Sequence, residues 1–210
     1  YITAGLICFI HLIPGEYVLP AITLIILLNL LLLFTEIVIR GMKRNISDIA
    51  ISLLGTCYVV FCLIFAPLIR DSLGNGRILI WYVFFIAWGT DIFAYLIGKN
   101  FGKHKFTEIS PNKSTEGCVA GILGSILLSM IYTLICNSVW NTEISYIYIF
   151  GLSVFLSVIS QIGDLAASSV KRYCEIKDFS NLIPGHGGIL DRIDSVIFIL
   201  PFAYFLLSII

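Results

Sequence analysis

Three aspartates near the end of the chain have the residue type and spacing that suit cation binding. Asp191 and Asp194 are three residues apart, so both would lie on one face of a helix. Asp164 precedes Asp191 by 27 residues. Carboxylate oxygens are the ligands that hard divalent cations prefer. The pattern therefore predicts a site in which Asp164, Asp191 and Asp194 hold a divalent cation.

The stretch between these aspartates also carries cations and glycines that suit phosphate groups. Its basic residues are Lys171, Arg172, Lys177 and Arg192, and its glycines are Gly185, Gly187 and Gly188. Cations neutralise phosphate charge, and glycines followed by a helix N-terminus allow backbone N–H groups to approach an anion. A Lys-Arg pair after a membrane helix is usually an interfacial anchor, and paired glycines are usually a turn. Their joint occurrence beside three carboxylates indicates metal-assisted phosphate chemistry.

The composition shows where such a site must be built. The chain has 210 residues, of which 59% are apolar and 12% are charged, whereas soluble domains carry about 25% charged residues. This excludes a soluble enzyme, a disordered chain and a disulfide-stapled secreted domain. Net charge is zero, which argues against a nucleic-acid partner. We expect an integral membrane protein.

Apolar runs and their breaks predict an all-α bundle of about seven membrane helices. The expected segments are 1–13, 17–39, 48–69, 78–97, 117–136, 144–170 and 193–210, since a span needs roughly 20 mostly apolar residues. The sixth is over-long and should project beyond the bilayer core. We expect a single integral-membrane domain over 1–210, with N-terminal helices in 1–89 and a motif-bearing catalytic half in 90–210. No signal peptide is predicted at the start, Tyr1.

The charges in the loops predict the orientation. Eleven of the 13 basic residues fall in alternate loops on one side, and two, Arg70 and Arg77, fall on the other. The side with more lysine and arginine is normally cytoplasmic. Asp91, late in the fourth segment, then reaches the same depth as Asp164 and Asp194. The expected polar site therefore faces the cytoplasm, although three unrelated helix-end charges would give the same pattern.

Two blocks of this sequence resemble the phosphatidate cytidylyltransferase family, also called CDP-diacylglycerol synthases. All 27 positions from Ser168 to Asp194 match that family's signature: Ser168-x-Val170-Lys171-Arg172, Lys177-Asp178, and Pro184-x-His186-Gly187-Gly188-x-x-Asp191-Arg192-x-Asp194. Residues 91–105 and 110–117 are similar to a second block. The resemblance covers about 90–210, and residues 1–89 match only as generic membrane helices.

The resemblance implies transfer of a cytidylyl group from CTP to phosphatidate, which gives CDP-diacylglycerol and pyrophosphate in phospholipid biosynthesis. It implies Mg²⁺ as cofactor, with a second cation left open, and a bacterial inner membrane with the active site facing the cytoplasm. The implied catalytic residues are Asp164, Asp191, Asp194 and Lys171. The implied substrate-binding residues are Ser168, Arg172, Lys177, Asp178, His186, Gly187, Gly188, Arg192, Asn112 and Lys113. Glu116 is expected to orient Lys113, and Asp91 to be a nearby structural or supporting acid.

Two other functions stay open at this stage. A CTP-dependent enzyme that acts on an isoprenoid ether lipid would use a similar pocket. An ion-coupled transporter would also place carboxylates in the membrane, but here the carboxylates lie at one face beside a basic loop. The Gly117-x-x-x-Gly121 spacing indicates either close helix packing within the chain or the seam of a homodimer.

Overall fold

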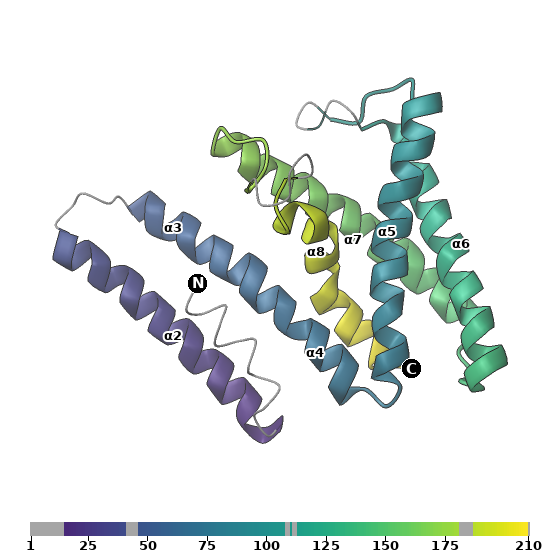
Figure 1. The fold of residues 1–210 in the computed structure, drawn as a ribbon, viewed down its shortest axis with the longest axis horizontal. Coiled ribbons are helices and arrows are strands. Elements are labelled where there is room, and N and C mark those ends of the chain that lie inside the picture. Colours follow the sequence, from purple (N-terminus) through teal and green to yellow (C-terminus); the bar gives the residue numbers. More distant parts are fainter. Residues whose placement is uncertain (1–14, 41–45, 108–109, 111–112, 181–186, 210) are drawn as a thin grey trace. The chain divides into compact units, whose positions relative to one another are not determined.

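A computed structural model describes residues 15–40, 46–107, 110, 113–180 and 187–209 (Figure 1). Helices account for most of this part of the chain, as the apolar runs predicted. The first predicted segment, 1–13, lies outside the described residues. The chain divides into two compact units, with the boundary between Pro67 and Leu68.

The described part of the first unit contains two apolar helical stretches. The first is α2, Gly15–Arg40. The second begins with α3, Ile46–Gly55, continues through a π-helical turn, Thr56–Phe61, and runs on as α4, Cys62–Ser72. The unit boundary falls inside α4. The predicted segments 17–39 and 48–69 match these stretches within a few residues.

In the second unit, the described residues after α4 form a bundle of four helices. They are α5, Gly76–Phe101; α6, Thr115–Trp140; α7, Tyr146–Tyr173; and α8, Leu190–Leu207. In this unit α5 contacts α6, α7 and α8, and α7 contacts both α6 and α8. Fully buried apolar side chains from α5, α7 and α8 form the core, among them Tyr82, Ile86, Ile149, Leu156, Ile197 and Leu200.

Glycines on α6 allow α5 to approach closely. A Cβ on Gly117 would lie 2.7 Å from the Ala94 carbonyl oxygen, and one on Gly121 would lie 2.8 Å from that of Thr90. Both positions therefore exclude a larger side chain. The Gly117-x-x-x-Gly121 spacing allows close helix packing within the chain, which is the first of the two interpretations predicted for it.

Hydroxyl pairs link the helices of this bundle at several depths. Thr90 Oγ1 and Ser157 Oγ are 2.7 Å apart, and Ser129 Oγ and Ser153 Oγ are 2.6 Å apart. All four side chains are fully buried. An interhelical hydrogen bond of this kind contributes about 0.6 kcal/mol in a membrane protein. Polar pairs therefore fix how the helices are rotated against one another.

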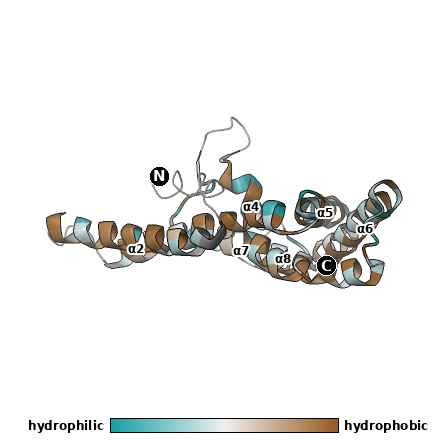
Figure 2. Cartoon of the chain, turned by 90° about the horizontal axis from the view of Figure 1, so that it is seen from below, coloured by the Kyte–Doolittle hydropathy of each residue, from teal (hydrophilic) through white to brown (hydrophobic). Residues whose placement is uncertain are grey.

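Four of the described helices are long and apolar enough to cross a membrane: 49–72, α5, α6 and α7. Many large hydrophobic side chains of these helices are exposed, and hydrophobic residues predominate along α2 (Figure 2). At 1.5 Å per residue the 28 residues of α7 span about 42 Å, beyond the roughly 30 Å of a hydrocarbon core. The first turns of α8 carry Asp191, Arg192 and Asp194. The chain is an integral membrane protein.

Candidate active site

The helix ends that carry the signature residues surround a cavity of about 300 Å³. It lies between the later half of α5, the start of α6, the later half of α7 and the start of α8. Its lining residues are Asp91, Ala94, Tyr95, Ser110, Lys113, Ser114, Gly117, Cys118, Gln161, Asp164, Asp191 and Asp194. Four acids and one lysine among the described residues therefore share one small cavity, as the common depth of Asp91, Asp164 and Asp194 predicted.

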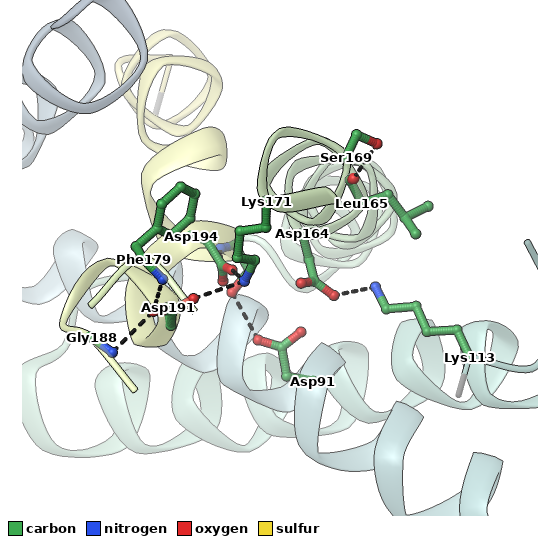
Figure 3. Close-up of polar contacts among 11 residues, drawn as sticks. Asp91, Lys113, Asp164, Leu165, Ser169, Lys171, Phe179, Gly188, Asp191 and Asp194 are labelled. Carbon is green, nitrogen blue, oxygen red and sulfur yellow. Dashed lines mark hydrogen bonds and ion pairs between the residues drawn. The ribbon is translucent and has the colours of Figure 1, made fainter. Parts of the chain in front are cut away.

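Lys171 joins the two acids of α8 (Figure 3). Its Nζ lies 2.8 Å from Asp191 Oδ1 and 3.8 Å from Asp194 Oδ2. It comes from the last turns of α7, seven residues or about two turns after Asp164, so it lies on the same side of that helix. The three side chains are between 5% and 13% exposed. This is a nearly buried ion-pair cluster in which one ammonium serves two carboxylates.

Asp191 also holds the segment that precedes α8. Its Oδ2 accepts hydrogen bonds from the backbone N–H groups of Phe179, at 2.9 Å, and Gly188, at 3.0 Å. Burial by itself would raise the pKa of the Asp191 carboxyl, but the hydrogen bonds donated to it outweigh burial and hold that pKa below its usual value. The Lys171 ammonium also lies 5.2 Å from the centre of the Phe179 ring. Asp191 thus acts as an ionised anchor for this part of the loop.

Lys113 pairs with Asp164 across the cavity (Figure 3). It lies in the loop before α6, which is closed by a bridge between Lys105 and Ser114. The prediction that Glu116 orients Lys113 is wrong. Glu116 instead accepts a 2.6 Å hydrogen bond from His104 Nδ1 and further bonds from nearby backbone N–H groups. Glu116 therefore fixes the start of the loop, and Asp164 is the partner of Lys113.

Asp91 joins the site through a residue of α8. Its Oδ2 accepts a 2.8 Å hydrogen bond from Ser195 Oγ. The backbone N–H of Ser195 donates to Asp194 Oδ1 at 2.9 Å. A single residue of α8 therefore contacts acids from two different helices.

Comparisons with known proteins assign the family. A family described as "Cytidylyltransferase family" matches residues 2–210. The chain belongs to this family. It is 40% identical over 185 residues to a phosphatidate cytidylyltransferase of Bacillus subtilis (strain 168), covering 88% of this chain and 67% of that protein. It is 39% identical over 169 residues to one of Staphylococcus aureus (strain COL), covering 79% of this chain and 61% of that protein. The chain thus spans about two thirds of the length of these relatives.

Several predicted residues of this cytidylyltransferase-family chain are not among those that line the cavity. Ser168 is half-buried on α7, one turn after Asp164, whereas Arg172 on α7 and Arg192 on α8 are exposed. Lys177 and Asp178 are exposed in the segment after α7. Gly187 has a positive φ of 81°, and a Cβ there would lie 3.2 Å from Asp178 Oδ1. Asp178 thus lies against the glycine segment. The substrate contacts expected for all these residues stay predictions.

Asn112 and His186 lie outside the described residues. Gly188 is buried, and its N–H is directed at Asp191. Sequence reasoning missed Ser195 and Gln161. Gln161 Nε2 donates to the Cys118 carbonyl at 3.1 Å, which ties α7 to α6 at the cavity wall. The signal for both was a polar side chain in an apolar helix within four residues of a predicted acid.

The donor chemistry of the cavity fits a divalent cation. Its carboxylates are hard oxygen ligands, and they outnumber the neighbouring ammonium groups. Across residues 15–40, 46–107, 110, 113–180 and 187–209, no three His, Cys, Asp or Glu side chains converge closely enough to hold a metal by themselves. Mg²⁺ is usually held by one or two carboxylates, waters and substrate phosphates. The arrangement therefore suits an ion that shares its coordination with a phosphate substrate.

Proposed function

We propose that this protein transfers the cytidylyl group of CTP to phosphatidate, releasing pyrophosphate and forming CDP-diacylglycerol. The observation that carries the proposal is the cavity where Asp164, Asp191 and Asp194 meet Lys113 and Lys171 at the ends of membrane-spanning helices. Such a site offers positively charged side chains to a triphosphate and lies within reach of a lipid headgroup. The relatives at 34–40% identity are named phosphatidate cytidylyltransferase, which supports the same reaction.

The reaction is a displacement at phosphorus. A phosphate oxygen of phosphatidate attacks the α-phosphorus of CTP, a new P–O bond forms, and the bond to the β-phosphate oxygen breaks as pyrophosphate leaves. The attacking oxygen is already anionic near neutral pH, so no strong general base is required. Positioning of the two anionic substrates and stabilisation of the leaving group then supply most of the rate enhancement.

Two lysines, Lys113 in the cavity lining and Lys171 paired with two of its acids, provide fixed positive charge for these phosphates. Lys113 and Lys171 come from opposite sides of the site, one before α6 and one at the end of α7. Each is held by a carboxylate, so each is positioned before substrate arrives. We assign Lys171 and Lys113 to contacts with phosphate oxygens, together with the exposed cations Arg172, Lys177 and Arg192.

A divalent cation, which we take to be Mg²⁺, completes the site in this proposal. Asp164 and Asp194 are the residues that would hold it, because both line the cavity from adjacent helices. When bound, the cation would neutralise the triphosphate and stabilise the pyrophosphate leaving group. Asp191 stays a predicted ligand, although its oxygens here accept bonds from Lys171, Phe179 and Gly188.

We further propose that the cavity faces the cytoplasm across a bacterial inner membrane. The loop between α5 and α6, the segment between α7 and α8, and the helix ends that adjoin them hold eight of the chain's 13 basic residues. The positive-inside rule assigns that side to the cytoplasm. CTP is a cytosolic nucleotide, so the orientation and the substrate agree.

The test is a turnover assay on the purified protein in detergent micelles. The protein receives CTP labelled at the α-phosphate, Mg²⁺, and either phosphatidate or an isoprenoid ether lipid phosphate. We expect labelled CDP-diacylglycerol from phosphatidate and release of unlabelled pyrophosphate. If product forms only with the isoprenoid lipid, that lipid replaces phosphatidate as the proposed acceptor. If CTP is not consumed with either lipid, the proposal is contradicted.

A further inference from the structure

Ser195 occupies an unusual place between two acids of the cavity. It is 1% exposed. Its hydroxyl donates to Asp91 Oδ2 at 2.8 Å, and its own backbone N–H donates to Asp194 Oδ1 at 2.9 Å. The hydroxyl bond ties α8 to α5 at the level of the site. Ser195 lies one position beyond the last residue of the signature that identifies the family.

Asp91 needs such a donor because it lines a cavity that is rich in negative charge. Asp164, Asp191 and Asp194 line the same cavity. Nearby like charges repel one another, and a carboxylate can turn about its side-chain bonds to move away from them. The bond from Ser195 fixes Oδ2 of Asp91 and so sets the direction of the whole carboxylate.

A neighbouring hydrogen bond shows what a purely structural link looks like. Thr90, next to Asp91 on α5, pairs with Ser157 of α7 at 2.7 Å, and both side chains are fully buried. Neither residue lines the cavity. The two bonds resemble each other in length and in joining α5 to another helix, although the Ser195 bond is only partly buried. They also differ in the acceptor, which for the Ser195 bond is a cavity carboxylate.

We propose that Ser195 is a positioning residue that holds Asp91 beside Asp194 and Asp164, so that α5 contributes a carboxylate to the cation-binding cavity. This inference rests on the proposed function for its chemistry. It assigns Asp91 a part in cation affinity and Ser195 the task of orienting it. Loss of a hydrogen bond that orients a group at a metal site weakens metal binding or activity about 10-fold to 100-fold.

The experiment measures cation binding directly, without CTP or lipid. Mn²⁺ is titrated into the detergent-solubilised full chain, and free Mn²⁺ is read by electron paramagnetic resonance. The variants are Ser195→Ala, Ser195→Thr and Asp91→Asn, with Ser157→Ala as the matched control. Melting temperatures are recorded for each variant, because both serine-to-alanine changes remove one interhelical hydrogen bond.

We expect Ser195→Ala to weaken Mn²⁺ binding about tenfold, while its melting temperature falls by no more than that of Ser157→Ala. Ser157→Ala should bind Mn²⁺ as the wild type does. Ser195→Thr keeps the hydroxyl and should restore most of the affinity. Asp91→Asn keeps an acceptor oxygen for Ser195 but removes the charge, so it should bind Mn²⁺ as weakly as Ser195→Ala.

Four results would overturn the inference. They are wild-type affinity in Ser195→Ala, equal loss of affinity in Ser157→Ala, wild-type affinity in Asp91→Asn, and a wild type that binds no Mn²⁺ without substrates. Should Ser195→Ala fail to fold, Asp91→Asn carries the test. A wild type that binds Mn²⁺ in a Ser195-dependent way but makes no CDP-diacylglycerol would contradict the proposed function and leave this inference standing.

Discussion

The ammonium of Lys171 lies 2.8 Å from Asp191 Oδ1, and this pair connects the end of α7 to the start of α8. The 16 residues between the two helices include the densest part of the family signature. Because Asp191 also accepts bonds from the N–H groups of Phe179 and Gly188, one carboxylate holds that segment at two separate points. The ion pair therefore links the fold of the bundle to the shape of the site.

Replacing Lys171 by methionine should destabilise the protein and abolish most activity. The change leaves Asp191 and Asp194 nearly buried without their shared ammonium, and breaking a buried pair from one side costs roughly 3 kcal/mol. We expect a clearly lower melting temperature. The double variant Lys171→Met with Asp191→Asn should regain part of that loss, because it removes one unpaired charge. The exposed Lys105→Met serves as control, and a Lys171→Met protein that melts with the wild type would contradict the assignment.

Replacing Asp191 by asparagine should loosen the segment that precedes α8. Hydrogen bonds to a charged group contribute roughly 1.5–3 kcal/mol, and neutralising Asp191 weakens the bonds from Phe179 and Gly188. Hydrogen exchange followed by mass spectrometry should show faster exchange in residues 174–180 and 187–189. Exchange in α6 should stay unchanged, and equal exchange in the loop segment of both proteins would argue against the anchoring role.

Two glycines should respond oppositely to alanine. A Cβ at position 121 would meet the Thr90 carbonyl oxygen at 2.8 Å, whereas a Cβ at position 151 would meet nothing within 4 Å. Gly121→Ala should therefore lower stability by about 1–3 kcal/mol through overpacking. Gly151→Ala should be neutral or stabilising by up to about 1 kcal/mol, because glycine weakens a helix. Thermal unfolding in one detergent compares the two, and equal stabilities would be inconsistent with the α5–α6 contact.

Cys174 offers a direct test of orientation. It is exposed just after α7, in the segment that we assign to the cytoplasm. A membrane-impermeant maleimide should label it in inverted vesicles of the bacterial inner membrane and leave it unlabelled in intact spheroplasts. The Cys174→Ser variant identifies the signal that belongs to this residue. Labelling of Cys174 in spheroplasts alone would place the loop on the outer side.

The sequence was enough to predict the helices and the shared depth of the site. Apolar runs broken by charged loops predicted α5 to α8 within a few residues, because a hydrocarbon core requires long apolar segments. Alternating helix direction then brought Asp91, Asp164 and Asp194 to one level, and all three line one cavity.

Which side chains pair with one another could not be predicted in the same way. Glu116 was expected to orient Lys113, but it binds His104, while Lys113 pairs with Asp164. Partners depend on how each helix is rotated about its axis, and α6 is apolar around most of its circumference. The glycine contacts and the buried hydroxyl pairs set that rotation, and neither can be assigned a partner from spacing alone. Ser195 was missed for the same reason.

The most direct test of the account compares wild-type turnover with that of Asp194→Asn. Labelled CTP, phosphatidate and Mg²⁺ are supplied to both proteins, and Asp71→Asn, which changes an exposed acid in the last turn of α4, is the control. We predict Mg²⁺-dependent CDP-diacylglycerol synthesis by the wild type and the control, and a loss of about 100-fold or more in Asp194→Asn. Equal rates for Asp194→Asn and the wild type would contradict the claim that the carboxylate cavity is the active site.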